Sequence, residues 1–184
     1  METTLKLQAV QKVIGVEELS STHDLARELA PAETHATLVL ACSQTDTRTT
    51  NGVCIPYGEG GVYFTLILKP AKQLDKSNLS RALQNALSDT LTKVFELKTK
   101  INANGNLLVW DATTRSYKKI ALVETEQYTE GTYLLSVTVA LNNRLSGTVS
   151  KEWTTLKKLT HSETSKELFL DEVLDNFWKE YAFL

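Results

Sequence analysis

The segment 37–70, TLVLACSQTDTRTTNGVCIPYGEGGVYFTLILKP, predicts a strand, a long polar loop and a second strand. Its first six residues form a short apolar run, and residues 62–68 are rich in β-branched and aromatic side chains, which favour strands. The loop between them is too long for a tight hairpin, and such loops inside compact domains are usually functional. It contains Gln44, Arg48 and Gly52, followed by three more glycines. A polar loop with a cation and several glycines, held between two buried strands, suits an anionic ligand.

The composition narrows the class of protein. The chain has 184 residues, of which 42% are hydrophobic and 23% charged, and its formal net charge is −2. These values are typical of one globular domain with a sizeable core, and so small a charge indicates no nucleic-acid partner. No apolar run approaches the roughly 20 residues of a membrane span, and the first residues lack the basic start of a signal peptide. Cys42 and Cys54 have no CxxC spacing, so we expect a cytoplasmic protein with reduced thiols.

Outside the central segment, apolar periodicity predicts helices packed against a sheet. Ser21 and Thr164 each open a helix, because a hydroxyl that can cap free amides is followed three residues later by Asp24 or Glu167. The expected helices are 22–30, 77–95, 149–159 and 165–182, and the further strands are 13–16, 107–109, 118–124 and 132–143. Together these elements predict the α+β class, with a mixed, largely antiparallel sheet packed by helices. We expect a single domain over residues 1–184, without internal repeat or linker.

Two motifs give a family resemblance. The central segment is similar to the first signature region of the biotin–protein ligases, with Gln44, Arg48 and Gly52 in place and GVYFTLILKP following at residues 61–70. Residues 21–30, STHDLARELA, resemble the family pattern Ser-Thr-Asn-x-x-Ala-x-x-x-Ala, with histidine in place of asparagine. The resemblance implies the class II synthetase-like catalytic domain of biotin and lipoate ligases. For this chain we expect no appended DNA-binding or C-terminal β-domain.

Later positions resemble the family residue by residue, with several departures. Lys119 falls on the second lysine of the Lys-Lys pair that begins a strand in the family. Asn142 keeps the family's asparagine, and Asn106 stands where the family has an aspartate. Glycines of the family pattern are replaced by Leu122, Thr138 and Ala140, and arginines of its phosphate loop by Thr50, Asn51 and Val53. Glycine lets a ligand lie against the backbone, so the added side chains are expected to narrow any pocket.

The resemblance implies an ATP-dependent attachment of biotin to a lysine of a biotin carboxyl carrier protein. The carboxylate of biotin first attacks the α-phosphate of ATP, and the carrier lysine then attacks the biotinyl-adenylate. Both steps need cations and amides directed at developing negative charge. ATP and Mg²⁺ are expected as substrates, without a tightly bound cofactor, and no histidine spacing indicates a protein metal site.

The site residues follow from the same resemblance and are expected to converge on one pocket. Arg48 and Lys119 are the expected catalytic residues. The expected biotin-binding residues are Ser21, Thr22, Gln44, Arg48 and Lys119, and the expected nucleotide-binding residues are Gly52, Asn106 and Asn142. Without the resemblance, Ser21 is interpreted as a helix N-cap with no role in binding, and Lys119 as a solvent-exposed charge at the edge of a strand.

Because the phosphate loop has lost three of the family's arginines, two hypotheses about the activity remain open. One is a divergent but active biotin–protein ligase, for which Asp46 beside the phosphate path predicts weak ATP binding and slow transfer. The other is a non-catalytic relative of the ligase fold that binds a small acid or a protein partner. A third alternative is that the chain shares only the fold of the ligases and not their function. Transfer of lipoate or octanoate in place of biotin is a further, less favoured alternative. Monomer and homodimer both stay open. The loop 45–60 is expected to become ordered when a ligand binds.

Overall fold

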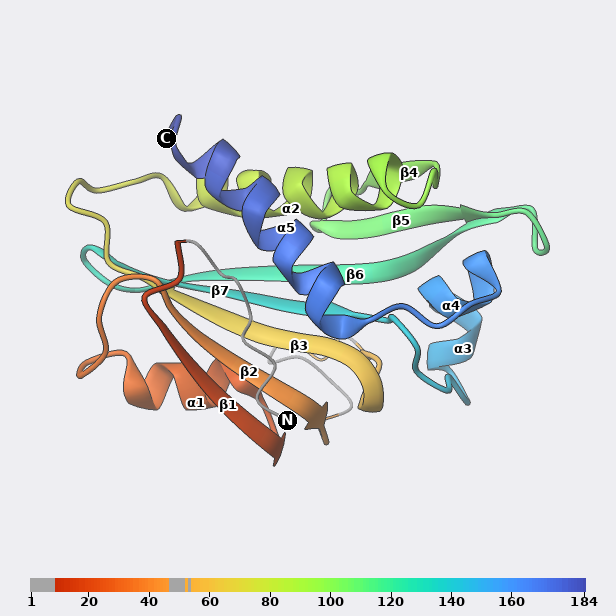
Figure 1. The fold of residues 1–184 in the computed structure, drawn as a ribbon, viewed down its shortest axis with the longest axis horizontal. Helices are drawn as coiled ribbons and strands as arrows, with labels where there is room; N and C mark the ends of the chain where they lie inside the picture. The colour runs from red at the N-terminus through yellow and green to blue at the C-terminus, as the bar shows by residue number, and fades with distance from the viewer. Residues whose placement is uncertain (1–8, 47–51, 53) are drawn as a thin grey trace.

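The computed structural model describes residues 9–46, 52 and 54–184, and these form one seven-stranded sheet with helices on both faces (Figure 1). The strand order is β1-β2-β3-β7-β6-β5-β4, and every neighbouring pair is antiparallel except β1 and β2. The strands are β1 (Lys12–Leu19), β2 (Thr37–Gln44), β3 (Gly58–Leu68), β4 (Thr99–Ile101), β5 (Asn106–Asp111), β6 (Ser116–Thr129) and β7 (Thr132–Val139). The helices are α1 (Thr22–Leu29), α2 (Lys76–Lys93), α3 (Val149–Glu152), α4 (Leu156–Thr160) and α5 (Lys166–Tyr181). The expected α+β class is confirmed.

The parallel pair β1 and β2 exists because helix α1 connects them. Ser21 begins this helix: its backbone is extended and its hydroxyl accepts a hydrogen bond from the Asp24 amide. Such a cap satisfies one of the free amides of the first turn. Ala26 and Ala30 then pack on Val39, Ile67 and Leu134 of the sheet. The N-terminus of α1 is thereby fixed over one face of the central strands.

The larger core lies on the other face of the sheet, beneath α2 and α5. Leucines 79, 83, 87 and 91 are fully buried on α2, as their four-residue spacing predicts. They share one apolar cluster with Phe169, Leu170, Val173, Leu174 and Phe177 of α5. Burial of aliphatic and aromatic side chains is the main favourable term in folding, so this face supplies most of the stability. The apolar cluster on the opposite face, beneath α1, is smaller, and polar side chains lie beside it.

The end of the chain differs from the sequence expectation in two places. The helix expected over 149–159 is divided into α3 and α4, because Trp153 is extended and its backbone forms a bridge with Lys119. Thr155 then caps α4 through the Lys158 amide. Helix α5 is capped by Ser165, whose hydroxyl accepts from Leu168, and not by Thr164. Thr164 instead pairs its backbone with the Asn142 side chain.

None of the helices in the described part of the chain is both long and apolar enough to span a membrane.

Candidate functional site

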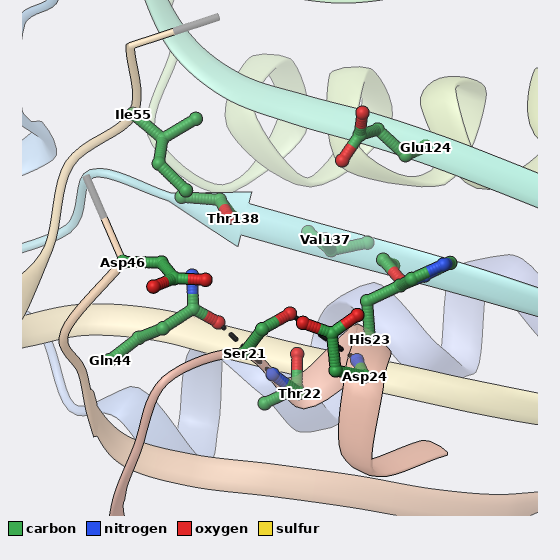
Figure 2. Close-up of a pocket in the computed structure, with 11 residues that line it drawn as sticks. Ser21, Thr22, His23, Asp24, Gln44, Asp46, Ile55, Glu124, Val137 and Thr138 are labelled. Carbon is green, nitrogen blue, oxygen red and sulfur yellow. Dashed lines mark hydrogen bonds between the residues drawn. The ribbon is translucent and has the colours of Figure 1, made fainter. Parts of the chain in front are cut away.

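A cavity of about 190 Å³ lies between the N-terminus of α1 and the polar side chains of Glu124, Ser136 and Thr138 on β6 and β7. Figure 2 shows the side chains of this cavity coming from the start of α1, the end of β2 and the residues that follow it, Ile55 of the loop before β3, and strands β6 and β7. The lining residues are Ser21, Thr22, His23, Asp24, Gln44, Asp46, Ile55, Glu124, Ser136, Val137 and Thr138. The β1–α1–β2 connection thus brings residues 21–24 beside residues 44 and 46.

Three of the five residues expected to hold biotin meet in this cavity. Ser21 and Thr22 lie at the start of α1, and Gln44 ends β2 beside them. The side-chain oxygen of Gln44 accepts a hydrogen bond from the Thr22 amide at 3.2 Å, which fixes its orientation (Figure 2). Gln44 is 95% buried, and its amide nitrogen has no hydrogen-bond partner among the described residues. Arg48 lies outside the described residues.

Behind the cavity, five polar side chains form a continuous hydrogen-bonded chain. Thr65 Oγ1 donates to Thr22 Oγ1 at 3.1 Å and lies 2.8 Å from Ser136 Oγ. Ser136 Oγ lies 2.8 Å from His23 Nδ1, and His23 Nε2 lies 2.7 Å from Glu126 Oε2. Buried polar groups that are fully paired in this way rigidify their surroundings. The chain therefore holds the Ser21–His23 turn against β3, β6 and β7.

His23 occupies the position at which the resemblance has asparagine, and its role is set by this chain. Both of its ring nitrogens contact partners from other elements, Ser136 on β7 and Glu126 on β6. Glu126 is also paired with Arg27, at 3.4 Å, one turn further along α1. The histidine therefore anchors α1 to the sheet. Both nitrogens of its ring thus already have partners among the described residues.

The cavity is acidic. Its described lining includes three carboxylates, Asp24, Asp46 and Glu124, and no lysine or arginine. None of the three forms a salt bridge or a side-chain hydrogen bond within the described residues. Burial raises the pKa of Glu124 above the usual range, and the neighbouring His23 offsets this only in part. The raised pKa means that the Glu124 carboxylate is held in a setting that disfavours its charge.

Sequence reasoning missed Glu124 and Ser136 as cavity residues, and Thr65 as a member of the hydrogen-bonded chain behind the cavity. Thr65 and Ser136 face each other across the β3–β7 pair, and Ser136 faces Glu124 across the β7–β6 pair. Each is a polar residue within a buried strand, and side chains opposite one another in paired strands point to the same face. A polar residue inside an apolar strand is visible in the sequence. Only the strand register, however, shows that these three residues lie side by side on one face of the sheet.

Lys119 is separated from the cavity by an apolar cluster. The β5–β6 register places Lys119 opposite Leu108, on the same face of the sheet as Glu124, with Leu122 between them along β6. Leu122 packs with Ile55, Ala140, Val149 and Trp153, and none of these side chains is more than 9% exposed. Two of the positions where the resemblance has glycine therefore fill the path from the cavity to Lys119.

The Lys119 side chain is engaged at its present position. Its ammonium group lies 2.8 Å from Glu152 Oε2 at the end of α3, and the side chain is 20% exposed. The hydrogen bond and the charge of Lys119 lower the pKa of Glu152. The Lys119 carbonyl accepts a hydrogen bond from the Thr154 amide at 2.9 Å. Lys119 is not among the residues that line the cavity, so the expected convergence stays a prediction for this residue.

The residues expected on the nucleotide side have structural partners. Asn142 donates through its side chain to the Thr164 carbonyl at 2.8 Å and accepts from the Thr164 amide at 3.1 Å. Asn106 donates to the Asn102 side chain at 3.3 Å, and its own side-chain oxygen is buried without a partner among the described residues. Gly52 adopts a positive φ of 77°, a conformation that glycine adopts at little cost. The eroded positions Thr50, Asn51 and Val53 lie outside the described residues.

Glycines at the start of β3 permit a close contact near Asn142. A Cβ atom on Gly60 would lie 2.8 Å from the Asn142 carbonyl carbon, and one on Gly61 would lie 2.3 Å from the Tyr63 ring. Tyr63 is fully buried and accepts a hydrogen bond from the Asn143 side chain at 2.7 Å. Burial raises the pKa of Tyr63 to about 12, although the hydrogen bond from Asn143 opposes this. These glycines serve packing of the strand.

Comparison with known proteins establishes the fold. A scan against models of protein families finds no match for the sequence. The structure is similar to the biotin protein ligase from Aquifex aeolicus in complex with biotin and ATP, with a TM-score of 0.79 and 21% identity, covering 94% of this chain and 71% of that chain. It is also similar to the biotin protein ligase from Leishmania major in complex with biotinyl-5-AMP, with a TM-score of 0.69 and 17% identity over 91% of this chain and 74% of that one.

A third similar structure carries no assigned activity. It is a biotin protein ligase-like protein of unknown function from a Silicibacter species, with a TM-score of 0.70 and 12% identity over 93% of this chain and 70% of that chain. The chain therefore has the fold of the biotin protein ligase catalytic domain. Because one fold supports different activities, function has to be argued from the cavity and its surroundings.

Proposed function

We propose that this chain is a slow, cytoplasmic biotin–protein ligase that retains the binding of biotin and binds ATP weakly. The observation that supports this most is the meeting of Ser21, Thr22 and Gln44 in one cavity. The Gln44 amide nitrogen and the hydroxyls of the Ser21–Thr22 turn are donors and acceptors suited to a polar head group. A cavity of about 190 Å³ accommodates a small bicyclic head but not a large ligand.

In this proposal, the chain's own residues hold the acid and position its carboxylate. The head group lies in the cavity, with Gln44 fixed by the Thr22 amide. By the family resemblance, Arg48 and Lys119 would neutralise the charge that develops at the carboxylate of the acid during adenylation. Gly52, Asn106 and Asn142 mark the nucleotide side that the resemblance implies. Mg²⁺ would arrive on the phosphates of ATP as part of the substrate, because this ion usually keeps phosphate and water ligands.

The reaction is expected to be slow because the route to Lys119 is obstructed. Leu122, Ala140 and Trp153 occupy the face between the cavity and this lysine, and Lys119 is paired with Glu152. Losing one preorganised donor of a transition state typically reduces the rate about a hundred- to a thousand-fold. Turnover would then require the lysine to leave Glu152 and the apolar cluster to shift.

The test is transfer of labelled biotin to a purified biotin carboxyl carrier domain, with and without ATP. We expect slow, ATP-dependent transfer by the wild type and its loss in Gln44→Ala, which removes both the free amide nitrogen and the acceptor of the Thr22 amide. Gln127→Ala is the matched control, since Gln127 is exposed on β6. Transfer that is equally fast in both variants would contradict the placement of biotin in this cavity.

A non-catalytic relative is the second candidate, favoured by the same obstruction. If the apolar cluster and the Lys119–Glu152 pair are permanent, the cavity binds a small acid or the fold binds a protein partner without adenylation. Biotin binding without any transfer, even at high ATP and enzyme concentrations, would identify this case. The lipoate and octanoate alternatives are distinguished by offering these acids in the same assay.

A further inference from the structure

Two largely buried side chains line the cavity with polar atoms that form no hydrogen bond within the described residues. Gln44 is 95% buried and Thr138 is 91% buried, and both side chains line the cavity (Figure 2). Neither the Gln44 amide nitrogen nor the Thr138 hydroxyl has a hydrogen-bond partner within the described residues. Neither atom is one of the fully buried polar atoms without a partner, so both are accessible from the cavity. A bound ligand would satisfy both groups.

The charge of the cavity restricts what that ligand can be. Within the described residues, the carboxylates of Asp24, Asp46 and Glu124 form no salt bridge, and the cavity lining contains no lysine or arginine to balance them. Ionised carboxylates act only as hydrogen-bond acceptors, so they require N–H or O–H donors from the ligand. An anionic head group would be repelled, and an alkyl head group would leave every one of these groups unsatisfied.

Glu124 is the most effective of the three for selection. It projects from β6 in the middle of the sheet, opposite Ser136, whereas Asp24 lies on the exposed first turn of α1. His23, the titratable group acting on it from α1, is already engaged by Ser136 and Glu126. A partly buried charge is screened less than a surface charge, so its attraction for a ligand cation is stronger.

We propose that the cavity selects a carboxylic acid whose head group carries several N–H donors and tolerates positive charge, and that Glu124 makes this selection. The inference rests on the proposed function, because it concerns the same cavity. A urea ring meets the requirement for N–H donors, and a guanidinium ring meets it with a charge that complements Glu124. Saturated acyl chains such as octanoate meet neither condition. The ligand's own carboxylate must lie away from the three acids.

The test compares three ligands by calorimetric titration without ATP. The ligands are biotin, 2-iminobiotin, in which a guanidinium replaces the urea, and octanoate. The proteins are the wild type, Glu124→Gln, and Glu130→Gln as the matched control, since Glu130 is an exposed acid of the same hairpin outside the cavity. Thermal unfolding of each variant verifies that it is folded at the titration temperature.

We expect the wild type to bind 2-iminobiotin about tenfold more tightly than biotin and to show no measurable binding of octanoate. In Glu124→Gln the two affinities should become equal within about threefold, while Glu130→Gln should behave as the wild type does. Because a ligand cation stabilises the ionised form of Glu124, 2-iminobiotin binding should also release protons at mildly acidic pH, and Glu124→Gln should abolish this release.

The contrary outcomes separate this inference from the proposed function. If biotin binds but 2-iminobiotin binds no more tightly, or if the ratio is unchanged in Glu124→Gln, the inference is overturned and the biotin-binding proposal stands. If octanoate binds as well as biotin, the inference is overturned likewise. If the folded wild type binds neither biotin nor 2-iminobiotin, the proposed function falls and this inference falls with it.

Discussion

The cavity at α1 and the region around Lys119 share one face of the sheet but differ in what their polar groups are doing. Within the described residues, the Gln44 amide nitrogen and the Thr138 hydroxyl form no hydrogen bond in the cavity, and Glu124 forms no salt bridge. Around Lys119, the ammonium group is paired with Glu152, and Asn142 holds the backbone of Thr164. One region is arranged to receive a ligand, and the other is arranged to hold the fold together.

The difference teaches that a residue in a family position is not thereby available for the family's chemistry. Lys119 occupies the right strand and face, yet Leu122 lies between it and the cavity. Glycine at positions 122 and 140 would leave the backbone open to a ligand, whereas Leu122 and Ala140 pack with Trp153. The replaced glycines and the paired lysine therefore point to one common consequence, which is reduced access to the reacting atoms.

The largest expected effect concerns the Lys119–Glu152 pair. Lys119→Ala should reduce adenylate formation by about a hundred-fold or more, if this lysine neutralises charge in the transition state. Glu152→Gln should raise the rate several-fold, because it frees the lysine from its partner. The measurement is pyrophosphate release in single turnover with biotin and ATP.

Lys157→Ala is the control for this experiment, because Lys157 pairs with Glu163 on the surface at 2.7 Å. Exposed pairs of this kind contribute about 0–1 kcal/mol, so neither rate nor stability should change appreciably. A rate that falls in Glu152→Gln as far as in Lys119→Ala would contradict a catalytic role and assign the pair to structure alone.

A second test uses the titration of Tyr63, which accepts a hydrogen bond from Asn143, the residue after Asn142. Its folded pKa of about 12 exceeds the value near 10 expected when unfolded, so the unfolded state loses its proton first as the pH rises. Stability should be unaffected by this group below pH 10 and should fall between about pH 10 and 12, by up to about 3 kcal/mol. Denaturant unfolding at several pH values measures this.

Tyr63→Phe should lack that alkaline loss of stability, at a cost of about 1 kcal/mol at neutral pH for the lost hydrogen bond with Asn143. Tyr117→Phe, on a partly exposed tyrosine of β6, should retain the wild-type pH profile. An unchanged alkaline profile in Tyr63→Phe would mean that another group causes the loss.

A smaller effect is expected from Asn142→Ala. The substitution removes two hydrogen bonds to the Thr164 backbone and should lower the free energy of unfolding by about 2 kcal/mol. Asn104→Ala, in an exposed turn, should change it little. Because both polar atoms of Asn142 are engaged, the affinity for ATP should be unchanged in the folded variant. A selective loss of ATP affinity would instead make Asn142 a nucleotide ligand, as the resemblance implies.

Much of the fold could be predicted because it depends on local pattern. The leucines of α2 recur every four residues, and the Ser21 cap and the strands of segment 37–70 have clear composition signals. The division of the helix expected at 149–159 could not be predicted, since it depends on Trp153 pairing with Lys119, which is distant in sequence. Such tertiary contacts override local helix propensity.

The site divides in the same way. Ser21, Thr22 and Gln44 could be predicted from their motifs and do line one cavity. Glu124 and Ser136 became visible only once the register of β6 and β7 was known. The partner of Lys119 could not have been foreseen, because Glu152 lies on a short helix that is brought near by a non-local bridge.

The most direct test of the central claim is separate titration of the wild-type protein with biotin and with ATP. The account predicts that biotin binds measurably and that ATP alone binds at least about tenfold more weakly, corresponding to about 1.4 kcal/mol. Substitution of Gln44 should weaken the first titration and leave the second unchanged. Tight binding of ATP together with no binding of biotin would contradict the account, because it would place the intact ligand site in the region where the side chains are already engaged.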